Sequence, residues 1–170
     1  LHISKFAQKA SYQKNFLRGN KSQLEMSKKI ILSYEEFKKV KKYCKKKKIE
    51  FLSTPFDLQS IDFLKKLKMK YFKIPSGEIT NLPYLQKVAR TKKKIILSTG
   101  MANMKEIKEA LKIITSNGTK KENITILQCN TEYPTPLRDA NIRAMLTIKK
   151  TFNVNIGYSD HTKGIEASLA

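Results

Sequence analysis

The sequence has 170 residues, 40% of them hydrophobic, which is enough for one domain with a buried core and excludes a disordered or fibrous chain. Its 29% charged residues leave no uninterrupted apolar run near the ~20 residues that a membrane-spanning helix needs. The 35 Lys and Arg residues against 14 Asp and Glu give a formal charge of +21, which on its face suggests a polyanionic partner such as nucleic acid.

From residue 33 onward, helix-like and strand-like patterns alternate along the chain. Ser33 with Glu36 forms a capping box, and Asn103 with Glu106 forms another, so each pair predicts the start of a helix. The predicted strands are 49–52, 71–74, 95–97, 124–127 and 154–156. The predicted helices have apolar faces within 37–44, 61–67, 82–89, 107–114 and 142–152, with a further helix from about Gly164. This alternation indicates parallel βα units of the α/β class.

Polar residues gather directly after each predicted strand. In a TIM barrel the carboxyl ends of all strands face one common site, whereas an open doubly wound sheet uses mainly the loops at its switch point. The even spread of the polar clusters therefore favours a barrel. The clusters are Ser53-Thr54-Pro55, Ser76-Gly77-Glu78, Ser98-Thr99-Gly100, Asn130-Thr131-Glu132-Tyr133 and Ser159-Asp160-His161.

Lys73 interrupts the otherwise apolar strand 71–74, where an ammonium group is costly unless an anion meets it. An edge-strand lysine that reaches solvent along its stem is the alternative. Ser76, Ser98 and Ser159 follow their strands at matching positions. Several hydroxyl donors around one positive charge suit a phosphate group, although a single serine at a strand end is more often a helix cap.

His161 lies beyond the last predicted strand, where an imidazole could bind a divalent cation, act as an acid or base, or be purely structural. Asp160 and Glu78 are the carboxylates that we expect at the same rim. Tyr133 could offer its hydroxyl to a polyol or pack at the base of a loop.

The two cysteines, Cys44 and Cys129, cannot build a disulfide framework, and neither belongs to a metal-spaced pair. We therefore expect reduced thiols in a cytoplasmic protein. Cys44 falls on the apolar side of a predicted helix and is expected to be buried. The sequence begins at Leu1 and ends at Ala170 within an apolar stretch, so we expect it to be a piece of a longer protein.

Five segments, in the same order and along nearly the whole chain, together resemble the sialic acid synthase family, which comprises N-acetylneuraminate synthases and their legionaminic and pseudaminic acid relatives. The segments are FLSTPFD (51–57), KIPSGEITNLP (73–83), ILSTGMA (96–102), CNTEYPTP (129–136) and GYSDHTKG (157–164). The resemblance implies a (βα)8 TIM barrel in which residues 1–170 form the central part of the catalytic domain, about strands three to seven. It also implies that the first two strands, the last strand and a C-terminal antifreeze-like domain lie outside the chain, which by itself is expected to be inactive.

The implied activity is the condensation of phosphoenolpyruvate with an N-acylated mannosamine-type sugar, which releases phosphate and gives a nine-carbon 2-keto acid. In that family a divalent metal, Mn²⁺ or Mg²⁺, polarises the open-chain sugar aldehyde. An N-acetylneuraminate synthase that uses N-acetylmannosamine is the first expectation, and the complete protein is expected to be a homodimer.

The resemblance also implies roles for individual residues. The residues implied to hold phosphoenolpyruvate are Lys73, Ser76, Ser98, Thr131 and Ser159, with Thr131 at a position where relatives carry Asn. His161 would be one of two metal-binding histidines. Tyr133 and Asn20 would contact the sugar. Glu78 and Lys73 would lie near the reacting atoms.

Other interpretations stay open beside this one. A legionaminic acid synthase shares these motifs and would use a 2,4-diacetamido-2,4,6-trideoxymannose. A Lys-rich nucleic-acid-binding module would explain the charge but not Lys73 in an apolar strand, and only four of the 35 cations are the arginines on which nucleic-acid readers rely. A pseudoenzyme that keeps only the scaffold is a further possibility.

Overall fold

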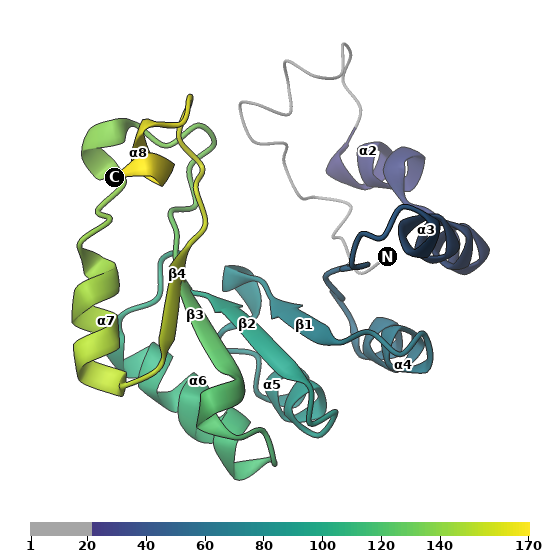
Figure 1. Ribbon diagram of the computed structural model, residues 1–170, viewed down its shortest axis with the longest axis horizontal. Helices are drawn as coiled ribbons and strands as arrows, with labels where there is room; N and C mark the ends of the chain where they lie inside the picture. Colours follow the sequence, from purple (N-terminus) through teal and green to yellow (C-terminus); the bar gives the residue numbers. More distant parts are fainter. Residues whose placement is uncertain (1–21) are drawn as a thin grey trace. The chain divides into compact units, whose positions relative to one another are not determined.

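The computed structural model describes residues 22–170 (Figure 1). The chain divides into two units, Leu1–Phe51 and Leu52–Ala170. No helix in the described part is long and apolar enough to cross a membrane.

The described part of the first unit consists of the helices α2 (Gln23–Ile30) and α3 (Tyr34–Lys46). The capping box predicted for α3 is confirmed, because the Glu36 carboxylate accepts the Ser33 N–H at 2.6 Å and the Ser33 hydroxyl accepts the Glu36 N–H at 3.3 Å. The expected burial of Cys44 is not observed. This thiol is half-exposed, and none of the residues of α3 is fully buried.

The second unit contains one parallel sheet whose strands lie side by side in chain order (Figure 1). Its strands are β1 (Tyr71–Ile74), β2 (Lys94–Ser98), β3 (Ile124–Gln128) and β4 (Asn155–Tyr158). Its α-helices are α4 (Leu58–Lys66), α5 (Leu82–Ala89), α6 (Met104–Ser116), α7 (Ala144–Phe152) and α8 (Glu166–Leu169). Short 3₁₀ helices are η1 (Ser76–Glu78), η2 (Lys121–Asn123) and η3 (Leu137–Asp139). A strand order without a reversal is that of a barrel wall, so the chain is a partial TIM barrel as predicted.

One predicted strand, 49–52, is wrong. These residues have no regular secondary structure, so the described part of the chain has four strands where the pattern predicts five. Phe51 is buried while Ile49 and Leu52 are exposed. The apolar run signals burial of one side chain, but a strand also needs a hydrogen-bonded neighbour, and no described strand pairs with this segment.

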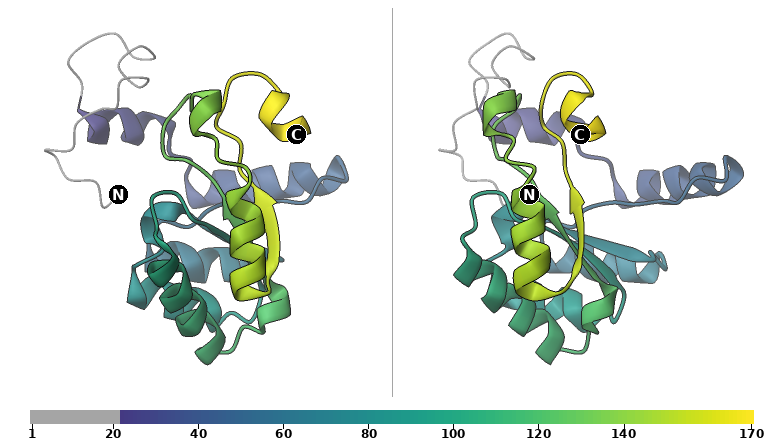
Figure 2. Two further views of the ribbon diagram at one scale, coloured as in Figure 1. Left: turned by 90° about the vertical axis from the view of Figure 1, so that its left-hand side faces the viewer. Right: turned by 60° about the vertical axis from the view of Figure 1, so that its left-hand side comes forward.

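The two faces of the sheet differ in what covers them. The side chains on one face are at most 1% exposed, and α5, α6 and α7 lie along that side (Figures 1 and 2). They are Phe72, Ile74, Ile95, Leu97, Ile124 and Ile126. Burying each such side chain stabilises the fold by about 1.5–3 kcal/mol. Because side chains alternate along a strand, Lys73 and its register partner Ile96 lie on the opposite face, which the three helices do not cover.

Candidate active site

Parallel strands that follow one another in a sheet end at the same edge, and the loops after β1, β2, β3 and β4 accordingly meet there. Predicted residues from three of these loops come together at Gly100, which has a positive φ of +52°. A side chain built at Gly100 would overlap Ser76, with its Cβ 2.6 Å from the Ser76 Oγ and 3.1 Å from the Thr131 Cγ2. Ser76 and Thr131, from the loops after β1 and β3, are therefore neighbours across this glycine.

Lys73 occupies the open face of β1 and is half-buried. Burial lowers the pKa of its ammonium group, and electrostatic attraction to Cys129 opposes that shift. β1 is an edge strand of the described sheet, as the edge-strand alternative requires. That alternative also predicts a lysine that reaches solvent freely, whereas this ammonium group is partly desolvated. A bound anion would offset that cost, so the position suits a phosphate or carboxylate ligand.

The three strand-end serines do not cap the helices that follow them. The N-cap residue of α5 is Asn81, that of α6 is Asn103, and that of α8 is Ile165. Their hydroxyls are therefore not committed to helix starts, which removes the simplest structural explanation for their recurrence.

Among the predicted residues, Ser98 has the environment that most favours a ligand-binding role. Its side chain is 3% exposed, and within the described residues its Oγ has no hydrogen-bond partner. An unpaired buried hydroxyl costs about 1–3 kcal/mol, so buried polar groups of this kind are usually paired. An oxygen-rich ligand at this edge of the sheet would satisfy it.

His161 joins the loop after β4 to the loop after β3. Its Nε2 lies 3.1 Å from the Tyr133 hydroxyl and 3.3 Å from the Ser159 hydroxyl, and its ring stacks on Tyr133 with centroids 4.1 Å apart. Its carbonyl accepts the Thr135 N–H at 2.8 Å. The structure therefore brings together three residues that the sequence predicts for the site.

A metal centre is only partly represented in residues 22–170. The Nδ1 of His161 is buried and has no hydrogen-bond partner among these residues, so this nitrogen is free to coordinate a metal ion. Within the same residues, however, no group of three or more His, Cys, Asp or Glu side chains could hold a metal ion. His161 is thus a candidate for one ligand, and the described residues do not complete the site.

The two predicted carboxylates are both engaged locally. Asp160 accepts hydrogen bonds from the Ser168 hydroxyl at 2.5 Å and from the Thr162 amide and hydroxyl at 2.8 Å each, and these bonds lower its pKa. It therefore ties the loop after β4 to α8. Glu78 accepts a hydrogen bond from the Asn81 side chain at 2.6 Å, and the described contacts do not join it to Lys73 or His161. Asn20 lies outside the described residues.

Two further residues at the carboxyl ends of the strands, Cys129 and Asn130, have buried polar atoms that the sequence analysis did not assign to the site. Cys129 is 3% exposed, and its Sγ accepts the Gly100 N–H at 3.3 Å. Asn130 donates to the Asp139 carbonyl at 2.7 Å, while its buried Oδ1 has no partner among the described residues. Alternation beyond the strand end could have placed Cys129 on the open face with Leu127, but its contact with Gly100 depends on the tertiary fold.

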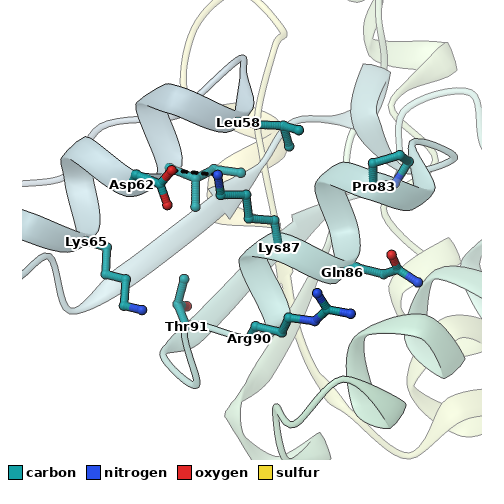
Figure 3. Close-up of a pocket in the computed structure, with 9 residues that line it drawn as sticks. Leu58, Asp62, Lys65, Pro83, Gln86, Lys87, Arg90 and Thr91 are labelled. Atoms are coloured by element: carbon teal, nitrogen blue, oxygen red, sulfur yellow. Dashed lines mark hydrogen bonds and ion pairs between the residues drawn. The ribbon is translucent and has the colours of Figure 1, made fainter.

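A separate hollow lies between α4 and α5, with a volume of about 450 Å³ (Figure 3). The Lys87 ammonium donates to the Asp62 carboxylate across it at 2.6 Å. Its lining comes from these helices and the residues that follow them, and none of the predicted site residues contributes. This hollow is therefore separate from the candidate site.

Gly100→Ala provides a first test of this arrangement. We expect it to lower the free energy of unfolding by about 2–4 kcal/mol, because alanine adds both a left-handed backbone strain and an overlap with Ser76. Gly77→Ala is the control, since a Cβ there has no atom within 4 Å, and we expect a change within about 0.5 kcal/mol. Chemical denaturation of the full-length protein measures both, and equal effects would contradict the assigned packing.

The comparisons with known proteins agree on a family. The sequence matches the NeuB family over residues 2–170. A protein from Campylobacter jejuni named N,N'-diacetyllegionaminic acid synthase is 54% identical over 168 residues, covering 99% of this chain and 50% of the relative. A protein of the same name from Legionella pneumophila is 42% identical over 165 residues, covering 96% of this chain and 46% of the relative.

Among solved structures, the N-acetylneuraminic acid synthetase of Leptospira borgpetersenii has a TM-score of 0.83 and 34% identity, covering 92% of this chain and 54% of that chain. The chain thus spans about half the length of the relatives it matches.

Proposed function

This chain belongs to the NeuB family, and from that premise we propose that the full-length protein is an N,N'-diacetyllegionaminic acid synthase. It would condense phosphoenolpyruvate with a 2,4-diacetamido-2,4,6-trideoxymannose and release phosphate. The supporting observation is the greater identity of the chain to the two relatives with that name than to the N-acetylneuraminic acid synthetase. N-acetylmannosamine, the first expectation from the resemblance, becomes the second candidate for the sugar.

The phosphate end of phosphoenolpyruvate would bind at the strand ends around Lys73. Its ammonium group supplies the positive charge, and Ser76, Ser98 and Ser159 supply hydroxyl donors that do not cap the helices α5, α6 and α8 that follow them. Thr131 adds a fourth hydroxyl beside Ser76. The buried Ser98 Oγ, which has no partner among residues 22–170, supports this assignment, because a phosphate oxygen would complete its hydrogen bonding.

The sugar would bind toward the loops after β3 and β4. Tyr133 presents its hydroxyl there beside the imidazole of His161. We propose His161 as one ligand of a Mn²⁺ or Mg²⁺ ion, the remaining ligands coming from residues other than those described. When bound, such an ion supplies Lewis-acid polarisation of the sugar aldehyde. Asn20 as a second sugar contact and Glu78 as an acidic group near the reacting atoms remain part of the proposal.

We further propose that residues 1–170 are the central part of the catalytic domain and need the rest of the protein for activity. The relatives are about twice as long as the chain, which supports this. A cytoplasmic homodimer remains the proposed state of the complete protein.

Phosphate release tests the proposed function. We expect the full-length protein with Mn²⁺ and phosphoenolpyruvate to have a kcat/KM at least about tenfold higher for the 2,4-diacetamido sugar than for N-acetylmannosamine, since contacts built for an amide reject an analogue without it. Preference for N-acetylmannosamine would replace the proposed substrate but keep the reaction. Silence with both sugars would favour a scaffold without catalysis.

A further inference from the structure

Cys129 lies at the junction of the loops that form the proposed phosphate site. It directly follows β3, it is 3% exposed, and its Sγ accepts the Gly100 N–H at 3.3 Å. Gly100 in turn lies against Ser76 and Thr131. One sulfur atom therefore fixes the backbone of the glycine around which three loops pack.

Strand register also places Cys129 on the same face of the sheet as Lys73. Lys73 is in register with Ile96, and Ile96 with Thr125, so continued alternation along β3 places Leu127 and then Cys129 on the face of Lys73. Electrostatic attraction to the Cys129 sulfur raises the pKa of the Lys73 ammonium group, against the larger lowering by burial. Cys129 thus contacts the amide of one site loop and lies on the face of the sheet that carries Lys73.

A buried cysteine often serves only as a small apolar side chain. Packing alone needs volume at this position, whereas the N–H···S bond needs an atom with lone pairs. Serine keeps such an atom, while valine keeps the volume and removes it. If Cys129 only packs, valine should preserve phosphoenolpyruvate affinity better than serine. If its sulfur acts as an acceptor, serine should preserve that affinity better than valine.

We propose that Cys129 is a positioning residue for the phosphate group of phosphoenolpyruvate, holding the Gly100 loop in the binding arrangement through its sulfur. The inference rests on the proposed function. It adds Cys129 to the residues of the phosphate site as one that acts through Gly100 without contacting the substrate. From its residue type alone, Cys129 would be assigned to the hydrophobic core.

The test compares Cys129→Val and Cys129→Ser in the full-length protein, with Cys44→Val and Cys44→Ser as matched controls on the half-exposed thiol of α3. We expect Cys129→Val to raise both KM and the calorimetric Kd for phosphoenolpyruvate about tenfold, the effect of losing one hydrogen bond near a charged group. The KM for the sugar should stay within about twofold, and Cys129→Ser should remain within about threefold of wild type for both substrates. The Cys44 variants should match wild type.

Each outcome bears on the inference. Normal phosphoenolpyruvate affinity in Cys129→Val overturns the inference and leaves the proposed function standing. The same conclusion follows if Cys129→Val and Cys129→Ser lose affinity equally, and lose it for the sugar as much as for phosphoenolpyruvate. If Cys129→Val does not fold, Cys129→Ala removes the acceptor without adding volume, and the same comparison with serine applies. A wild-type protein that binds no phosphoenolpyruvate overturns the proposed function and the inference together.

Discussion

Lys73→Met is expected to lower kcat/KM for phosphoenolpyruvate by about 100-fold to 1000-fold, because it removes the positive charge that would meet the phosphate in a partly desolvated site. The same change should leave the free energy of unfolding unchanged or raise it. Methionine keeps much of the lysine stem and its contacts, while the cost of burying an ammonium group disappears. Steady-state kinetics and chemical denaturation of the full-length protein measure the two effects.

The sign of the pH dependence follows from the lowered pKa of Lys73. Between that pKa and the ordinary value of 10.5, the native state binds fewer protons than the unfolded state. Native stability therefore rises as the pH increases through this window, and the cost of the buried charge is fully present at lower pH. Lys73→Met should remove this rise, so the stability difference between variant and wild type should shrink toward alkaline pH.

Lys94→Met is the matched control for Lys73→Met. Lys94 is also a strand lysine, but it is exposed at the start of β2, at the opposite edge of the sheet from the proposed site, with its Nζ 5.7 Å from the centre of the Tyr71 ring. We expect its loss to change kcat/KM by less than about twofold and stability by about 0.5–1 kcal/mol, the size of an exposed cation–π contact. Equal kinetic losses in both variants would mean that Lys73 acts through overall charge.

The sequence predicts those parts of the fold that depend on local rules. The strand Tyr71–Ile74 is found at its predicted bounds because Pro75 cannot continue it, and α6 begins after Asn103 because Asn103 and Glu106 cap it reciprocally. The range 49–52 fails because pairing with another strand is not a local property. The short helix α2 is absent from the predicted elements, although Ser22 and Glu25 form the same kind of capping box as the pair that begins α3.

The candidate site divides in the same way. Parallel strands carry their loops to one edge, so the recurrence of Ser76, Ser98 and Ser159 after strands could be read as one site from the sequence. The spacing of these motifs along the sequence does not predict which loops contact one another. The close approach at Gly100 and the hydrogen bond from its amide to Cys129 depend on strand register and loop conformation, which require the three-dimensional structure.

His161→Asn is expected to lower kcat by about 100-fold or more and to raise the Mn²⁺ concentration needed for half-maximal rate, because it removes a proposed metal ligand. The buried Nδ1 without a partner among the described residues gives the reason to expect a ligand at this imidazole. Metal titrations of phosphate release by the full-length protein measure both quantities.

Tyr133→Phe separates the metal role of His161 from its contacts with the loop after β3. It keeps an aromatic ring to stack on the imidazole, at the observed centroid distance of 4.1 Å, and removes only the hydroxyl 3.1 Å from the Nε2. We expect a rise in the KM for the sugar of about tenfold or less, with the Mn²⁺ requirement unchanged. If His161→Asn instead keeps the wild-type Mn²⁺ requirement while Tyr133→Phe alters it, the metal assignment to His161 is wrong. The imidazole would then serve to hold the Tyr133 hydroxyl toward the sugar.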